Sequence, residues 1–532
     1  MTAPLPDSSR ADTIFHGGVV WAGLHEPRGA TALAVRDGRI AAVGAGHDVL
    51  NLRGPSTEMV DLAGQTLLPG FVDAHAHIWK IGHLLTTLLD VRGADSLPDL
   101  VSRVSERAGR LAAGAWVQGR GYNEVRFPGG RGPSRADLDG AVSDRPVVLM
   151  RTCAHIVVCN TRALERAGIT RDTPPPPGGE IDRTEDGEPT GVLRETAMGL
   201  VLRHVPPPTG PEYESMIGAA LAHQLAQGIT STNDAGVAPE LLAAYHRLAR
   251  AGALPSRVNV MALRLVDGVG PVPLPADRHL SDHLRIDTVK FFADGGLSGA
   301  TAALSVPYRH AATHGVLRFE EAELLALARE AHDAGWRVAT HAIGDVAIDQ
   351  VLRVYEALGR GPKRHRIEHF GLPRPDHLAR AGRLGVIAAP QTIFLSALGR
   401  NFRLYLPDAL LARAYPVRAM LDAGITVALS SDAPVVEDDS PLSGMRAAID
   451  RRDPEGQPIA PDQAITLDEA LDAYTRGGAV ASGDDAVRGC LRAGMQADLT
   501  VVSGDLMGAP PEALTSLVVT QTWVGGRLAF ES

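Results

Sequence analysis

Short apolar runs alternate with longer amphipathic stretches between about residues 67 and 432. Stretches 319–334 and 345–358 carry apolar residues at helical spacing, whereas the short runs have the length and composition of buried strands. Because parallel strands need crossover helices, this alternation predicts an α/β fold, a (β/α)8 TIM barrel. The eight expected strands end near His75, Asn233, Leu265, Phe292, His341, His369, Ala389 and Asp432.

The two ends of the chain have a different pattern, with short strands and tight turns. Residues 32–44 place two apolar runs around Asp37-Gly38, which predicts a hairpin. Residues 498–502 and 518–524 read as strands, and a turn follows at Gly525-Gly526. We expect residues 1–68 and 485–532 to form one composite β-sandwich domain, and residues 69–484 to form the barrel domain.

A ninth strand candidate, residues 146–151, does not fit the count of eight. It lies in a long stretch after the first strand that also contains the run Pro174–Pro177. We expect residues 79–208 to be a cap subdomain inserted after strand 1. Because the loops at that end of a barrel form the mouth of its pocket, the insertion is expected to cap the pocket.

The composition and net charge of the chain indicate which kinds of molecule it can bind. The chain of 532 residues is 45% hydrophobic and has a net charge of −10, so it is a poor candidate for binding nucleic acid or anionic membranes. No apolar run is long enough to span a membrane, and the polar N-terminal residues do not resemble a signal peptide. Three cysteines without a CxxC motif indicate a reducing compartment. We expect a cytoplasmic protein that binds a small-molecule substrate, with a homodimer as the default assembly.

His75 and His77 alternate at the end of the first strand, so their imidazoles point the same way. Two neutral imidazoles suit a divalent metal, but an HxH pair alone is equally compatible with two structural histidines. Four further polar residues shift the balance towards a metal. Each lies at or near the carboxyl end of a predicted strand, where barrel enzymes place their chemistry: Lys290, His341, His369 and Asp432.

Motifs along nearly the whole chain then identify a resemblance. The chain resembles the amidohydrolase superfamily and, within it, the amidohydrolase family 3 branch, with its YtcJ-like and N-substituted formamide deformylase-like members. The stretches that carry the resemblance are 68–77 (LPGFVDAHAH), 191–195 (GVLRE), 289–296 (VKFFADGG), 340–345 (THAIGD), 366–369 (RIEH), 431–434 (SDAP), 469–475 and 494–499.

The resemblance implies a role for each candidate ligand. His75 and His77 would bind the more buried of two metal ions, and His341 and His369 the second. Lys290, N6-carboxylated, would bridge the ions, since a carbamate is an anionic oxygen donor whereas an ammonium is not. The alternative for Lys290 is a structural ion pair, for example with Asp294. The mixed ligands suit zinc, with iron, manganese or cobalt as alternatives.

The implied activity is hydrolysis of a non-peptide C–N bond in an amide, N-formyl, cyclic amide or carbamate-like group. A metal-activated hydroxide would attack the carbonyl, and Asp432 would contact the metal and carry the proton to the leaving nitrogen. One alternative is a mononuclear-metal deaminase of a ring compound, although such relatives usually lack the lysine on strand four. The second is a metal-free amidohydrolase-like scaffold, although such proteins typically lose several ligands.

Further residues are weaker candidates. His155 matches a histidine common in the branch and is a catalytic candidate, with a structural role as the equal alternative. Tyr122 is followed by Asn123, where the family usually has aspartate, so a role for that position is in doubt. The predicted substrate-binding residues are Tyr122, Glu195, Asp294 and Gln391.

Overall fold

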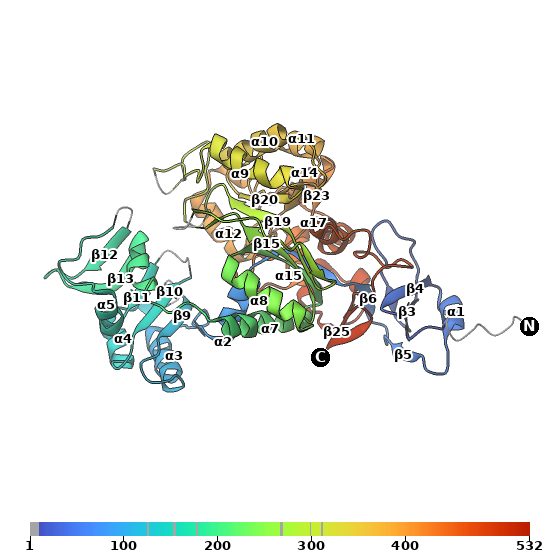
Figure 1. Cartoon of the computed structure of the whole chain (residues 1–532), viewed down its shortest axis with the longest axis horizontal. Helices are drawn as coiled ribbons and strands as arrows, with labels where there is room; N and C mark the ends of the chain where they lie inside the picture. Colours follow the sequence, from blue (N-terminus) through green and yellow to red (C-terminus); the bar gives the residue numbers. More distant parts are fainter. Residues whose placement is uncertain are drawn as a thin grey trace, which may run out of the picture. The chain divides into compact units, whose positions relative to one another are not determined.

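The computed structural model describes residues 10–124, 127–152, 156–176, 179–266, 270–297, 299–309 and 312–532, without the side chains of Glu195 and Val266. The chain divides into two compact units (Figure 1). The first combines Met1–Ile78 with Ala220–Ser532, and the second is Trp79–Ala219.

Eight parallel strands form the centre of the first unit, giving the expected α/β barrel-like fold. Each strand pairs with the next along the chain, apart from a short antiparallel strand, β18 (His279–Ser281), on β19. The eight are β7 (Phe71–Ala76), β14 (Ile229–Val237), β15 (Arg257–Leu263), β19 (Leu284–Phe292), β20 (Arg337–Ala342), β21 (Arg366–His369), β22 (Ile387–Ala389) and β23 (Thr426–Val427).

Hydrogen bonds link the segment after β23 to β7, the first strand. The backbone N–H of Asp432 donates to the His75 carbonyl at 2.8 Å, and the N–H of His77 donates to the Ala433 carbonyl at 2.9 Å. The segment that follows the last barrel strand is therefore a neighbour of the first strand. This connection places Asp432 beside the HxH pair, although the eighth strand ends at Val427 and not at Asp432 as predicted.

The apolar run 67–73 contains parts of two strands that belong to different sheets. Gly70 separates β6 (Thr66–Pro69) from β7, and β6 pairs with β2 (Val19–Val20) and β24 (Leu499–Val502). A Cβ atom at Gly70 would lie 2.3 Å from the hydroxyl oxygen of Thr230, so only glycine allows the backbones to approach here. Apolarity is the same on both sides of the glycine, so hydrophobic periodicity alone does not mark this break.

Strands from both ends of the chain share a sheet, in the order β2-β6-β24-β25 (Val519–Val524)-β26 (Arg527–Glu531). A second sheet has the order β4 (Arg39–Gly44)-β3 (Ala32–Arg36)-β1 (Thr13–His16)-β5 (Glu58–Asp61), and β3 and β4 form the predicted hairpin. One buried cluster includes Phe15 and Leu33 from the N-terminal part with Leu491 and Trp523 from the C-terminal part. The sandwich arrangement of the two sheets stays a prediction.

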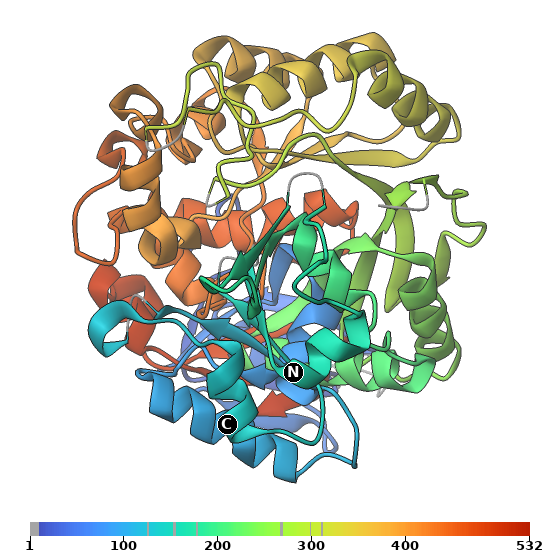
Figure 2. The ribbon, with the colours of Figure 1, turned by 90° about the vertical axis from the view of Figure 1, so that its left-hand side faces the viewer.

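Helices form an outer layer around the barrel strands; those of residues 321–422 are yellow to orange in Figure 2. The predicted helices 319–334 and 345–358 are α9 (Glu321–Asp333) and α10 (Asp345–Leu358). Other helices of this layer include α7 (Gly210–Ala226), α8 (Pro239–Arg250), α11 (Pro375–Leu384), α12 (Ile393–Tyr405), α14 (Val417–Asp422), α15 (Pro441–Asp450), α16 (Leu467–Asp472) and α17 (Gly478–Ser482). Within the described ranges, no helix combines the length and apolarity needed to cross a bilayer.

The second unit contains a six-stranded sheet. Its order is β12 (Gly179–Arg183), β13 (Pro189–Glu195), β11 (Ile156–Cys159), β10 (Val147–Arg151), β9 (Val117–Tyr122) and β8 (Leu89–Asp90). The ninth strand candidate, 146–151, is β10, the fourth strand of this order. Helices α3 (Leu97–Gly109), α4 (Arg135–Ala141) and α5 (Thr161–Ala167) contribute to two buried clusters that form the core of the unit.

Candidate metal centre

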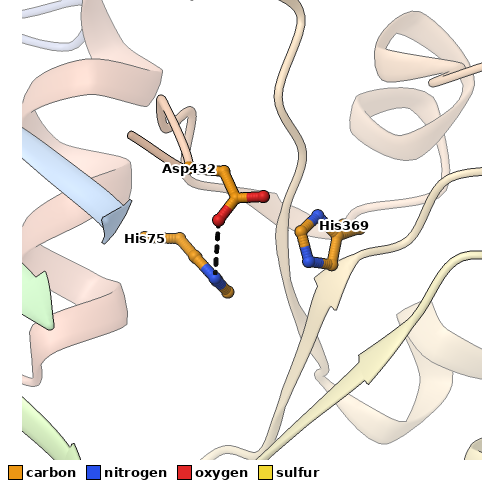
Figure 3. Close-up of side chains that lie close together, drawn as sticks. All are labelled: His75, His369 and Asp432. Carbon is orange, nitrogen blue, oxygen red and sulfur yellow. Dashed lines mark ion pairs between the residues drawn. The ribbon is translucent and has the colours of Figure 1, made fainter. Parts of the chain in front are cut away.

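Side chains from β7, from β21 and from the segment after β23 converge at the carboxyl ends of the barrel strands. Asp432 Oδ1 lies 3.1 Å from Nε2 of His77 and 3.4 Å from Nε2 of His75. One ligand-capable atom from each of His75, His369 and Asp432 lies within 4.8 Å of the other two, and Figure 3 shows the three side chains around a common space. All are buried. Two imidazole nitrogens and a carboxylate oxygen form a donor set typical of zinc and similar divalent ions.

Each of three imidazoles hydrogen-bonds through Nδ1 to an oxygen acceptor. His75 Nδ1 lies 2.5 Å from Glu368 Oε2, His77 Nδ1 lies 2.7 Å from the Ala235 carbonyl, and His369 Nδ1 lies 2.6 Å from Gln391 Oε1. The Gln391 amide nitrogen donates to the Ala389 carbonyl, which leaves its oxygen to accept from His369. Acceptors at all three Nδ1 atoms fix the protons there, so each Nε2 lone pair is available to a metal.

The hydrogen bonds of the His341 ring differ from those of the other three imidazoles. Its ring lies 4.4 Å from that of His369, centroid to centroid, but its Nε2 is 3.1 Å from the Gly295 carbonyl. The same nitrogen is 3.3 Å from Asp294 Oδ1. When Nε2 donates to that carbonyl, Nδ1 becomes the nitrogen that His341 offers to a metal. Asp294 also accepts backbone hydrogen bonds from Ala303, Ile343 and Gly344, so it fixes the loops around His341.

Lys290 is fully buried on β19, as its strand position predicted. Its ammonium lies 4.0 Å from the ring centroid of Phe292, a cation–π distance. Its positive charge lowers the pKa values of His75 and His369, which places Lys290 within electrostatic range of the convergent ligands.

Electrostatics favour neutral imidazoles beside an ionised carboxylate. Burial lowers the pKa of His75 and, more strongly, that of His369, where the charge of His341 adds to the effect. Burial alone would raise the pKa of Asp432, but the adjacent imidazoles of His77, His75 and His369 hold it well below its ordinary value. Near neutral pH the ligands are therefore in the protonation states that bind metal.

The backbone at two of the ligands is strained. His369 has φ of 68° and Asp432 has φ of 54°, in the left-handed region that non-glycine residues rarely adopt. Asp73 fixes the backbone next to Asp432. Its carboxylate accepts hydrogen bonds from the Ser431 hydroxyl at 2.5 Å and from the Ser431 N–H at 3.2 Å. Burial raises the pKa of Asp73 to about 7. Strain maintained by surrounding bonds is typical of functional sites.

Sequence reasoning missed the buried ion pair below the site. Arg366 donates to both carboxylate oxygens of Glu368, at 2.7 and 2.9 Å, and also to Asn233 and to the carbonyl of Ala74. Arg366 and Glu368 are both fully buried. The sequence did contain a pattern that indicates this pair. Two charged residues at positions i and i+2 of a strand point to the same side, and here that side is the barrel interior.

The remaining predicted residues have varied positions. Gln391 is fully buried and contacts His369. Tyr122 is buried in a hydrophobic cluster of the second unit, and Glu195 is the last residue of β13. His155 lies outside the described residues.

A second cluster with potential metal ligands, Asp349, Asp376 and His377, lies on α10 and α11. Asp349 is 2.5 Å from Arg380 and also contacts Arg353 and Arg374. Three guanidiniums beside this cluster already balance its carboxylates, so it is a poor cation site.

Comparison with known proteins identifies the family of this chain. Residues 58–530 match the model of the amidohydrolase family. The chain belongs to the amidohydrolase family. This membership makes the protein a hydrolase of C–N bonds.

Two curated relatives cover nearly the whole chain of this amidohydrolase. It is 32% identical to the putative amidohydrolase YtcJ of Bacillus subtilis, over 97% of this chain and 99% of that protein. It is 30% identical to the N-substituted formamide deformylase of Arthrobacter pascens, over 94% and 95% of the two chains. Among solved structures, an uncharacterized metal-dependent hydrolase from Pyrococcus horikoshii aligns with a TM-score of 0.78 at 27% identity, covering 94% of this chain and 99% of that one.

Proposed function

We propose that this amidohydrolase is a metal-dependent hydrolase of a small, non-peptide amide, with His75, His77, His369 and Asp432 as ligands of a divalent ion, zinc by preference. One observation carries the proposal: three imidazoles have their Nδ1 atoms occupied by acceptors, and two of them direct Nε2 at the same Asp432 oxygen. The similarity to a metal-dependent hydrolase from Pyrococcus horikoshii supports the use of a metal.

The chain's own residues have defined tasks in this reaction. A divalent ion held there supplies Lewis acidity, which lowers the pKa of water and polarises a carbonyl. Asp432, ionised near neutral pH, accepts the proton of the attacking water at a carboxylate oxygen. It then delivers this proton to the nitrogen that leaves. Glu368 and Gln391 hold the rings of His75 and His369 in position throughout.

We also propose a two-ion form of the site, in which His369, with its single free nitrogen, would bind a second ion together with His341, and N6-carboxylated Lys290 would bridge that ion to the one held by His75, His77 and Asp432. The burial of Lys290 supports this part, because a charged ammonium is disfavoured among buried imidazoles whereas an anionic carbamate is compatible with two cations. The proximity of the His341 and His369 rings gives further support. The test is metal stoichiometry together with the carbamate signal after incubation with ¹³C-labelled bicarbonate. One ion per chain and no carbamate would reduce the site to a mononuclear centre.

N-substituted formamides are the substrate class to test first. The relative from Arthrobacter pascens is named for deformylation of such compounds, and it aligns over almost the full length of both chains. Simple N-acyl amines, cyclic amides and carbamates share the same reacting group and form the wider class. The cap role of residues 79–208 and the contacts of Tyr122, Glu195 and His155 with substrate stay predictions.

An activity screen tests the proposed function. Zinc-loaded protein is incubated with N-substituted formamides, N-acyl amines, cyclic amides and carbamates, and the released amine is measured. We expect turnover of at least one class, with no turnover in a His75→Ala variant. Equal turnover in the two proteins would refute the role of the metal centre.

A further inference from the structure

A basic cavity of about 530 Å³ lies in the first unit, at the amino ends of the barrel strands. Arg285 lies near the start of β19, Arg337 begins β20, and Lys363 and Arg364 directly precede β21. The same three strands carry Lys290, His341 and His369 at or near their other ends. Because a strand rises about 3.3 Å per residue, this cavity and the metal centre are separated by roughly 15 Å of barrel.

Positive charge dominates the basic cavity. Five of its lining side chains are cationic, the four residues above and Arg278, whereas two are acidic, Asp287 and Asp485. The lining therefore has an excess of three positive charges in a protein whose net charge is −10. A concave surface of one sign concentrates ions of the opposite sign, so the basic cavity attracts anions although the whole chain repels them.

Two of the five cations already have carboxylate partners. Arg285 lies 2.6 Å from Asp484, and Lys363 lies 3.0 Å from Asp287. Because a carboxylate balances the charge of Arg285 and another balances that of Lys363, these two side chains have little positive charge available to a ligand. They fix the walls of the basic cavity and leave its three other arginines as the groups available to an anion.

Neutral acceptors hold these three arginines. Arg278 donates to the Gly335 carbonyl at 3.2 Å and stacks on the Trp336 ring at 4.5 Å. Arg364 donates to the carbonyl of Gly385 and the hydroxyl of Thr426, and Arg337 donates to the carbonyl of Ala481. In the part of the chain that the structure describes, no carboxylate lies within 4.0 Å of these three guanidiniums. The three arginines are positioned but not neutralised.

Arg337 gives the clearest sign of an incomplete site. It is only 4% exposed, and its Nε has no hydrogen-bond partner among the described residues. A Cβ atom on Gly483 would lie 3.0 Å from Nη2 of Arg337 and 3.3 Å from Nη1 of Arg285, so the two guanidiniums converge beside this glycine. Burying the Arg337 charge without a direct carboxylate contact is costly, and a bound anion beside it reduces that cost.

We propose that the basic cavity binds a small anion that carries two phosphate groups. Guanidinium groups match phosphate oxygens in paired hydrogen bonds, and the three arginines provide several such donors. Three guanidiniums without a direct carboxylate contact provide more paired donors than one phosphate group uses, so two phosphates match this lining better than one. The volume is within the range of small-molecule sites. This proposal is independent of the reaction at the metal centre.

Isothermal titration calorimetry of the full-length protein tests the proposal, with inorganic pyrophosphate and ADP as the two diphosphate probes. Citrate serves as a carboxylate anion of comparable charge. The test variant is Arg278→Gln/Arg364→Gln, which removes two cations that have no carboxylate partner. The matched control is Arg329→Gln on α9, since Arg329 also donates to one backbone carbonyl but does not line the basic cavity.

We expect pyrophosphate or ADP to bind wild-type protein, and to bind the double variant about ten- to a hundredfold more weakly. The Arg329→Gln control and a His75→Ala variant should keep the wild-type affinity. If pyrophosphate binds more tightly than ADP, the ligand type is inorganic diphosphate. If ADP binds more tightly than pyrophosphate, the ligand type is a nucleoside diphosphate. The proposal is overturned if wild-type protein binds neither diphosphate, or binds citrate more tightly than both. It is also overturned if the double variant binds the diphosphates as tightly as wild type, or if His75→Ala loses this binding.

Discussion

Glu368 Oε2 lies 2.5 Å from Nδ1 of His75, and both side chains are fully buried inside the barrel. Arg366 donates two hydrogen bonds to the same carboxylate. These contacts hold the pKa of Glu368 below its ordinary value despite its burial. An ionised Glu368 fixes the His75 proton on Nδ1 and directs the Nε2 lone pair towards Asp432, so this buried ion pair also orients a side chain that we propose as a metal ligand.

Glu368→Gln removes the charge but retains the shape of the side chain. We expect metal affinity to fall about ten- to a hundredfold, because the His75 tautomer is no longer enforced. Unfolding free energy should fall by about 3 to 5 kcal/mol, since Arg366 remains buried without its carboxylate. Equilibrium metal titration and urea unfolding measure the two effects. Glu356→Gln, which removes a carboxylate from an exposed pair with Arg380, is the control and should change stability by about 1 kcal/mol or less.

Asp432→Asn retains an oxygen ligand but removes the proton acceptor. We expect the protein to fold and to keep most of its metal, while kcat falls by about 10² to 10⁴. Steady-state kinetics on a substrate from the amide screen, with metal analysis of the same sample, provides the test. Asp438→Asn changes an exposed carboxylate on the same segment and should leave kcat unaltered. Wild-type turnover by Asp432→Asn would remove the proposed proton transfer.

His365 makes stability sensitive to acid. Val338 N–H donates to its Nδ1 at 3.1 Å, and its Nε2 lies 2.9 Å from Nδ1 of His332. Burial, with the charges of His332 and Arg337, lowers its pKa to about 4. The unfolded chain takes up this proton near pH 6.5, so the stabilisation is complete above that pH and is lost as pH falls to about 4.

His365→Gln should therefore be less stable than wild type at pH 7, by about 1 to 3 kcal/mol, because the Val338 N–H loses its acceptor. The difference should shrink as pH falls from about 6.5 to 4, since the variant has no buried imidazole to protonate. Urea unfolding at a series of pH values measures this. The exposed His47→Gln serves as control, and a difference that is constant with pH would contradict the assignment.

Asp498 connects the C-terminal strands to the barrel. It lies 2.7 Å from Nε and 2.9 Å from Nη2 of Arg257 on β15, and both side chains are at most 5% exposed. It also accepts from the N–H of Gly525 at 2.8 Å. Asp498→Asn should cost about 3 to 5 kcal/mol of unfolding free energy. The exposed partner of Arg309, Asp408, is the control, and Asp408→Asn should cost about 1 kcal/mol or less. Equal losses in the two variants would contradict this role.

The sequence predicted the barrel and most of its strand ends, because buried parallel strands are continuous apolar runs and their polar ends interrupt the pattern. His75, Lys290, His341 and His369 were located in this way on strands that the structure confirms. Asp432 was predicted at a strand end, but β23 stops at Val427 and Asp432 lies five residues beyond it. Its position depends on hydrogen bonds to β7, a long-range contact that local periodicity does not encode.

Other features of the structure could not be predicted from the pattern of residue types along the chain. The acceptor for His77 is a backbone carbonyl, that of Ala235, which any residue type could provide. The residues on both sides of Gly70 are equally apolar, so hydrophobic periodicity alone does not mark where β6 ends and β7 begins, whereas the close approach of Thr230 does. The basic cavity gathers residues that are far apart in the chain, from Arg278 to Asp485, and none of them forms a motif. Local patterns predict elements and their ends, whereas contacts between distant residues require the structure.

The central claim is that His75, His77, His369 and Asp432 hold a divalent ion. An anomalous difference map at the zinc edge, from crystals of zinc-loaded protein, tests it most directly. We predict a peak about 2.0 to 2.2 Å from Nε2 of His75 and from a carboxylate oxygen of Asp432, and no such peak in crystals of His75→Ala. A wild-type map without a peak there, or with its only peak at Asp349, Asp376 and His377, would contradict the account.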